Sequence, residues 1–236
     1  MTNSEMHSLR RAPATPVRSR TPVLQLVQTT RAQPAILERW PNLREAGVGN
    51  LDAAAAVGRD PFKSQIRLWM EKTERQDLLQ PVPNVPPLPD SAAYWNRLLE
   101  PIVAAHYTLR TGRQVRRTST LMRHPQHPWM FAGPGREVVG ACDVQLLECR
   151  CVGVDEAVLW AEGLPGYVQI QMLHQLAVAD AKAIDVVALV GGQDLQIHRV
   201  ERDEAEIARL IDAEREFWCC VELDQAPLAR DGEALP

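Results

Sequence analysis

At Gly112 the hydrophobic period of this 236-residue chain changes from that of a helix to that of a strand. In residues 92–111 apolar side chains recur every three or four positions, the spacing of one helix face. The expected apolar stripe is Trp95, Leu98, Leu99, Ile102, Val103 and Tyr107. Beyond Gly112 apolar and polar residues alternate, so residues 114–124, 128–140 and 144–151 predict three successive antiparallel strands. This change of period predicts a mixed α/β domain.

The flanking segments complete that domain. Residues 44–58 predict a Gly-bearing turn and an alanine-rich helix whose N-cap is Asn50 or Asp52. Residues 61–75 predict a helix that starts at Pro61. A helix over 167–180, a strand pair over 183–192 and 194–202, and a closing amphipathic helix over 202–218 follow. The core-facing residues expected on the second and last of these helices are Ile66, Trp69, Met70, Ile207, Leu210, Ile211 and Phe217.

Three segments are expected to lack regular structure, and the ordered domain is expected over residues 34–223. Residues 1–33 are rich in Ser, Thr, Pro and Arg and predict a flexible basic tail. Residues 77–91 contain five prolines and predict an extended loop inside the domain. Residues 224–236 predict a flexible C-terminal tail.

Composition limits the class of protein. A net charge of -4 argues against a general polyanion-coating protein, although a local basic groove is compatible with it. The sequence has no apolar run of about 18 residues and no apolar leader, so neither a membrane span nor a secretory signal is expected. Five cysteines, an odd number, fit reduced thiols in a bacterial or phage-infected cytoplasm better than a disulfide framework.

The run LLECRC at 146–151 is the first candidate for chemistry. Side chains alternate along a strand, so Glu148 and Arg150 share one face, while Leu147, Cys149 and Cys151 share the other. A helical glutamate, Glu100, could join Glu148 on one divalent cation, because two converging carboxylates are a usual arrangement for phosphodiester hydrolysis. Taken alone, the same pattern also fits an ordinary strand with two charges on its wet face.

Ordered motifs along the chain resemble the YqaJ-type viral recombinase family. This phage exonuclease group includes lambda exonuclease and lies within the PD-(D/E)XK nuclease superfamily. The resemblance runs from about Arg44 to Trp218. The segments that carry it are GVGNLDAAAAVGRDPFKSQIRLWMEKT, YWNRLLEP, HPQHPWMFAGPGREVVG, LLECRC, YVQIQMLHQLAV and VERDEAEI. It implies a single restriction-endonuclease-like domain with a mixed central sheet flanked by helices.

The same resemblance implies the residues of a site. The implied metal ligands, around Mg²⁺ or Mn²⁺, are Glu100, Glu148 and the backbone carbonyl of Cys149. In the implied catalytic set, Glu148 is joined by Arg150, which would steady the scissile phosphate or the attacking water, and by Gln171, which would support the site. The implied DNA-binding residues are Arg44, Asp52 and Lys63.

The sequence departs from the family pattern at four positions. Gly135 stands where the family has a metal-binding aspartate, and a glycine offers no side-chain oxygen. Arg150 stands where the family has lysine, and the reference pKa of arginine, well above that of lysine, makes it a poor proton carrier. Leu51 replaces a serine implicated in holding a terminal phosphate, and Asn96 replaces a glycine. The metal centre is therefore expected to be depleted, with Glu137 or Asp143 as substitute acids.

The remaining cysteines and histidines admit two readings each. Cys142, Cys149, Cys151, Cys219 and Cys220 match no iron–sulfur spacing, so buried thiols are favoured over a cluster. Residues 124–127 favour a turn with solvent-facing imidazoles over a metal pair. His174, on the predicted glutamine helix, favours packing or hydrogen bonding over metal ligation.

Three functions follow as expectations from the resemblance. The first is a phage-type DNA exonuclease of homologous recombination with a degraded active site. The second is a catalytically inactive protein that binds double-stranded DNA ends. The third is an interaction module for a single-strand annealing partner. The resemblance also implies a homo-oligomer, as a trimer.

Overall fold

The computed structural model describes residues 47–75 and 92–228. Its helices are α2 (Ala53–Ala56), α3 (Gln65–Lys72), α4 (Ala92–Thr111), α5 (Gly166–Ala179) and α6 (Glu204–Glu222), with a 3-10 helix at Ala157–Trp160. Its strands are β1 (Val48–Gly49), β2 (Val115–Arg117), β3 (Met122–Arg123), β4 (Met130–Ala132), β5 (Arg136–Val138), β6 (Leu146–Val152), β7 (Ala183–Val190) and β8 (Asp194–Glu201). None of these helices combines the length and apolarity that crossing a membrane requires. The expectations for residues 1–33 and 77–91 lie outside the described residues.

The strands form two mixed sheets. The smaller sheet has the order β1-β4-β3, with β1 parallel to β4. The larger sheet has the order β2-β5-β6-β7-β8, in which only β6 and β7 run parallel. The predicted mixed α/β architecture, with helices flanking the sheet strands, is confirmed.

One bent ribbon supplies strands to both sheets. Two breaks divide it, one between β2 and β3 and the other between β4 and β5, where Gly133, Pro134 and Gly135 stand. Proline has no amide hydrogen for a strand ladder, so the pairing weakens there. The amide of Thr118 still donates to the Gly135 carbonyl at 3.1 Å, which keeps the ribbon closed at the bend. The prediction of continuous strands over 114–124 and 128–140 was therefore wrong.

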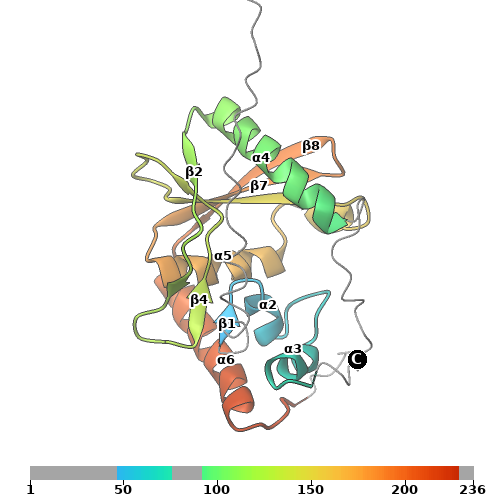
Figure 1. Cartoon of the computed structure of the whole chain (residues 1–236), viewed down its shortest axis with the longest axis vertical. Coiled ribbons are helices and arrows are strands. Elements are labelled where there is room, and N and C mark those ends of the chain that lie inside the picture. The colour runs from blue at the N-terminus through green and yellow to red at the C-terminus, as the bar shows by residue number, and fades with distance from the viewer. Residues whose placement is uncertain (1–46, 76–91, 229–236) are drawn as a thin grey trace, which may run out of the picture.

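The larger sheet lies between α4 on one side and α5 with α6 on the other (Figure 1). On the α4 side, Val103 and Tyr107 pack with Leu147 of β6 and Val187 of β7. On the α5 side, apolar residues of β6 and β7 join the larger core cluster with both helices. The two faces of β6 therefore open onto different layers of the molecule.

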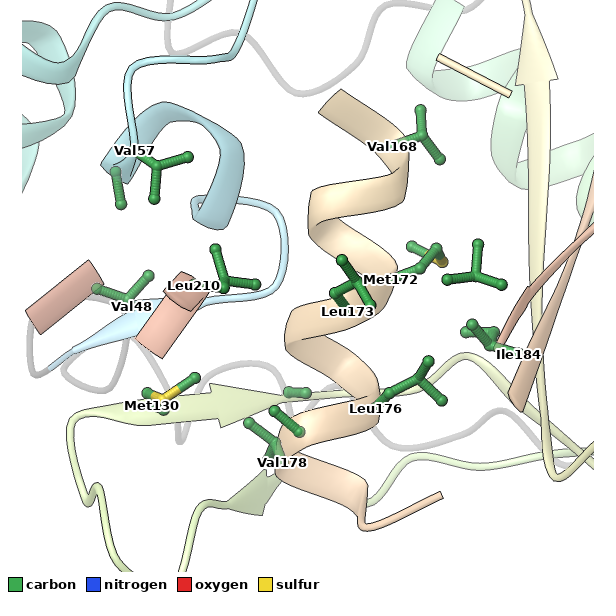
Figure 2. Packing of buried hydrophobic residues seen from close by; sticks show 14 of the residues in the cluster. Val48, Val57, Met130, Val168, Met172, Leu173, Leu176, Val178, Ile184 and Leu210 are labelled. Carbon is green, nitrogen blue, oxygen red and sulfur yellow. The ribbon is translucent and has the colours of Figure 1, made fainter. Parts of the chain in front are cut away.

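Helix α5 is the centre of the larger core. Figure 2 shows Met172 and Leu176 directed toward Ile184 of β7, while Leu173 points the other way, toward Leu210 of α6. Met172, Leu176 and Ile184 are completely buried. Each such side chain contributes about 1.5–3 kcal/mol to stability through burial. The residues that α5 carries into the site are consequently held on a rigid element.

The buried face of α4 differs from the predicted stripe. Val103 and Tyr107 are buried, but Trp95, Leu98 and Ile102 face solvent with 43%, 49% and 51% of their surface exposed. Apolar residues occur on more than one side of this helix, so helical spacing alone did not select the face that packs. The prediction that Trp95 belongs to the core was wrong.

The two N-terminal helices begin in different ways, and only α3 has a side-chain capping hydrogen bond. Asp52, one of the two predicted N-caps, is the N-cap of α2. Helix α3 begins after Ser64, whose hydroxyl accepts from the Arg67 amide at 3.1 Å, and not at Pro61 as predicted. On α6 the predicted core residues Ile207, Leu210 and Phe217 are buried.

Candidate functional site

Strand β6 presents its charged residues to α5 and its cysteines to α4. Leu147 is buried in the α4 cluster, and Cys149 and Cys151 pack against the same cluster. Leu146 and Val152 belong to the core cluster around α5. Because side chains alternate along a strand, Glu148 and Arg150 project to the α5 side. The division of faces predicted from LLECRC is confirmed.

On the α5 side, three predicted site residues meet. The Arg150 Nη2 donates to Gln171 Oε1 at 2.7 Å, and Arg150 Nε lies 3.2 Å from Glu148 Oε1. That second contact is an ion pair without hydrogen-bond geometry, since Nε is buried and has no hydrogen-bond partner. Gln171 is buried on α5, and its amide nitrogen reaches the Leu51 carbonyl at 3.5 Å. The strand, the helix and the N-terminal turn are thus joined through Arg150 and Gln171.

The turn before α2 brings the predicted residues Asp52 and Lys63 together. Gly47 is required here because a Cβ at this position would overlap the Trp129 carbonyl. Lys63 Nζ lies 3.7 Å from Asp52 Oδ1 and 2.7 Å from Glu71 Oε2. Lys72 Nζ donates to Asp52 Oδ2 at 2.7 Å. This turn is therefore part of a network of ion pairs between lysines and carboxylates directly beside Leu51.

Glu100 does not join Glu148. The Arg136 Nε donates to Glu100 Oε1 at 2.6 Å. Arg136 stands opposite Leu147 in the β5–β6 register, so its side chain projects to the α4 side of the sheet. Glu100 therefore reaches the sheet from the α4 side, whereas Glu148 projects to the α5 side.

The cysteine between these acids is held as a thiol. Burial, followed by the charge of Glu100, raises the pKa of Cys149 to about 12, so this side chain stays protonated near neutrality. Its backbone lies within the parallel pairing with β7, opposite Val187. The described cysteines are all free.

Gly135 occupies an open position at the bend of the ribbon. A Cβ built there would meet no atom within 4 Å, and its φ does not require glycine. A carboxylate at 135 would therefore fit sterically. The two candidate substitute acids are already engaged elsewhere: Glu137 pairs with Arg116, and Asp143 accepts from Arg113 at 2.6 Å.

The residues present do not fit a divalent cation as the family arrangement would. Within residues 47–75 and 92–228, no three His, Cys, Asp or Glu side chains gather as a metal site. The two candidate glutamates lie on different sides of β6, and each has an arginine at contact distance. We therefore assign no metal-dependent step to this arrangement.

Three contributors to this region were missed from the sequence. Arg136 directly follows Gly135, which stands at the family's aspartate position. This adjacency in the sequence was the feature that could have pointed to Arg136 as part of the site. Lys72 lies in the run EKT and is buried against Asp52, which spacing alone could not show. Phe62 is 58% exposed beside the site. The predicted DNA-binding residue Arg44 lies outside the described residues.

His174 is buried beneath the site and contacts only acceptors. Its Nδ1 lies 2.9 Å from both Glu214 oxygens, and its Nε2 lies 3.1 Å from the Phe131 carbonyl. Burial alone would lower the pKa of His174, but the Glu214 carboxylate and the Phe131 carbonyl reverse this, and the net shift is upward. The expectation of packing and hydrogen bonding is confirmed. His124 likewise forms a turn, since its Nδ1 accepts from the amides of Gln126 and His127 at 3.1 Å.

Comparisons with known proteins agree with this architecture. The model of the YqaJ-like viral recombinase domain matches residues 39–182. The uncharacterized protein YqaJ of Bacillus subtilis (strain 168) is 32% identical over 184 residues, which cover 77% of this chain and 55% of that protein. This chain thus spans about half the length of that relative.

Solved structures show the same fold. An alkaline exonuclease (LHK-Exo) from Laribacter hongkongensis superposes with a TM-score of 0.61 at 22% identity, covering 79% of this chain and 93% of that one. The structure of LHK-Exo in complex with dAMP gives a TM-score of 0.60 at 23% identity over the same shares. The match of the domain model over residues 39–182 shows that the chain belongs to the YqaJ-like viral recombinase family.

Proposed function

We propose that this chain binds double-stranded DNA ends in recombination and has lost the metal-dependent hydrolysis expected of its family. One observation carries the proposal: Glu100 and Glu148 lie on opposite sides of β6, each paired with an arginine. A cation entering either site would have to displace a guanidinium already in contact with the carboxylate. Repulsion between like charges opposes that exchange.

Several features support DNA as the ligand. A structural relative is an exonuclease, and it has been solved with a deoxynucleotide. In this chain the Arg150 side chain contacts Gln171 and Glu148 and remains 20% exposed, so part of the guanidinium can meet a phosphate oxygen. Guanidinium groups hold phosphate in two parallel hydrogen bonds. Lys63 and Arg67 add positive charge beside the same turn, although Glu71 partly neutralises both.

Fluorescence anisotropy with labelled duplex DNA tests the proposal. We expect binding to linear duplex in EDTA, unchanged by Mg²⁺ or Mn²⁺, and roughly tenfold weaker binding to a duplex closed by hairpins at both ends. Because phosphate contacts release counterions, the affinity should fall as salt rises. Gel analysis of the same samples should show intact DNA. Release of nucleotides by the wild-type protein with either metal would restore the exonuclease hypothesis.

Revertant variants provide the control. Gly135→Asp combined with Arg150→Lys restores the family residues at both positions, and adding Arg136→Gly frees Glu100. We expect digestion with Mn²⁺ from the triple variant only when position 135 carries the carboxylate. The matched control replaces Asp by its neutral isostere Asn at position 135. Equal digestion by the Asp and Asn forms would exclude a metal-ligand role for position 135.

A protein partner forms the second part of the proposal. Trp95, Leu98, Ile102 and Leu109 are exposed on α4, and an apolar stripe of this kind is a common feature of protein interfaces. A second copy of this chain is the proposed occupant, since the family resemblance implies a homo-oligomer. The single-strand annealing protein remains the alternative occupant.

A further inference from the structure

We propose that Phe62 is a stacking platform for the terminal nucleobase of the DNA strand whose phosphate contacts Arg150. The inference rests on the proposed binding of DNA ends and names the contact that would make an end different from internal duplex. It does not depend on whether the protein binds a metal ion or hydrolyses DNA.

The Phe62 ring is exposed yet fixed in place. It is 58% exposed, while its backbone amide donates to Asp60 Oδ1 at 2.8 Å. The amide of Lys63 donates to the same oxygen at 3.1 Å. Two hydrogen bonds to one carboxylate oxygen define a tight turn and limit the motion of the residues that it carries. An exposed aromatic on a rigid turn can offer a face to a ligand at little entropic cost.

Tyr167 holds the ring beside the Arg150 site. The two rings meet edge to face, with centroids 5.7 Å apart and an interplanar angle of 88°. Tyr167 lies in the first turn of α5, four residues before Gln171, so both project from the same side of the helix. Gln171 accepts from the Arg150 Nη2 at 2.7 Å, so the guanidinium lies one helical turn along α5 from Tyr167.

A second connection joins Phe62 to the same place through the N-terminal turn. The neighbouring Lys63 lies near Asp52, and Asp52 follows Leu51, whose carbonyl faces Gln171. The Leu51 side chain is 57% exposed and adds an apolar contact at this rim. Helices α2 and α5 lie side by side here, with α3 adjoining α2 (Figure 1). An exposed aromatic, an exposed apolar residue and two cations, Lys63 and Arg150, are therefore linked through Tyr167, Gln171 and Asp52 into one region.

This combination matches what a nucleotide at a strand end presents. Proteins bind single strands and ends by pairing cations for the phosphates with aromatic faces for the bases. A protein-docking surface would instead require a continuous apolar patch. Around Phe62 the charged residues Asp60 and Lys63 interrupt any such patch. A base is planar and tolerates charged neighbours at its edges, so it is the occupant that fits.

Duplexes carrying 2-aminopurine, a fluorescent base quenched by stacking, test the proposal. The probe is placed at the 5′ end, at the 3′ end, or in the interior of otherwise identical 5′-phosphorylated linear DNA. We expect the wild-type protein to change the emission of one terminal probe and not of the internal probe. Phe62→Leu should abolish that change and weaken end binding roughly 5–100-fold, whereas Phe62→Trp should retain both.

Controls separate this inference from the proposed function. Val158→Ala alters another exposed apolar residue, 74% exposed, and should leave binding and emission unchanged. Circular dichroism and thermal melting should show that Phe62→Leu folds normally. If the wild type does not bind DNA, the proposed function fails. If it binds ends and Phe62→Leu binds equally with unaltered emission, stacking by Phe62 is excluded while DNA binding stands.

Discussion

His174 shows how a single buried residue can support the site from below. Both ring nitrogens face acceptors, so each of these two contacts needs a proton. One proton lies on Nε2, toward the Phe131 carbonyl, and a second lies between Nδ1 and the Glu214 carboxylate. Glu214 belongs to α6, Phe131 to β4, and His174 lies three residues after Gln171 on α5. The buried pair therefore ties the glutamine helix to two other elements. Breaking such a pair by removing one partner leaves an uncompensated buried charge.

We predict that His174→Leu lowers the free energy of unfolding by about 3–5 kcal/mol. The double variant His174→Leu/Glu214→Leu should recover part of that loss, because no buried charge is left unpaired. The folded-state pKa of His174 is raised above its ordinary value of 6.5. Its contribution is therefore complete below pH 6.5 and is lost as the pH rises through the folded-state pKa.

Urea unfolding at pH 6 and pH 9 measures this dependence. The stability difference between wild type and the double variant should shift against the wild type at the higher pH. A difference that stays constant between the two pH values would contradict the assignment of a proton to this pair.

At the scale of elements, α4 has two apolar faces and only one of them packs within the described residues. Val103 and Tyr107 contact the sheet, and the Tyr107 hydroxyl donates to the buried Asp185 at 2.7 Å. The outer stripe has the spacing of a helix–helix seam, with Trp95, Leu98, Ile102 and Leu109 separated by three, four and seven residues. An unpartnered stripe of this spacing suits a second helix.

We predict that the wild-type chain forms an oligomer through this stripe and that Ile102→Asp disrupts it. Light scattering after size-exclusion chromatography should give a mass above the 26.4 kDa of one chain for the wild type and a mass near that value for the variant. Val158→Asp places the same charge at an exposed position off α4 and should not change the mass. A wild-type protein that is monomeric at every concentration would rule out self-association through α4.

The helices also show which structural features the sequence pattern can predict. The core face of α6 and the type of each of the longer elements followed from periodicity, because burial on one side imposes it. The packed face of α4 did not, because apolar residues occur on two sides of that helix. The start of α3 depended on the Ser64 hydroxyl, a local hydrogen bond that a nearby proline obscured.

At the scale of the whole molecule, the bend at residues 133–135 separates two sheets and exposes the position where the family has its aspartate. The sequence predicted strand structure there, but as one strand over 128–140 without the bend, and the family resemblance implied the missing acid at Gly135. It could not predict that Arg136 would occupy Glu100, because that contact depends on the register of β5 against β6 and on the placement of α4. Likewise, the face of β6 that carries Glu148 was predictable from alternation, whereas its separation from Glu100 required the packing of both layers.

The central claim is that arginines, and not a metal ion, neutralise the glutamates at 100 and 148. Titration of Mn²⁺ into the protein, followed by the electron paramagnetic resonance signal of the free ion, tests it without reference to activity. We predict no saturable binding up to roughly millimolar Mn²⁺, a range typical of weak sites. Binding of one Mn²⁺ per chain, lost in Glu148→Gln, would contradict the account.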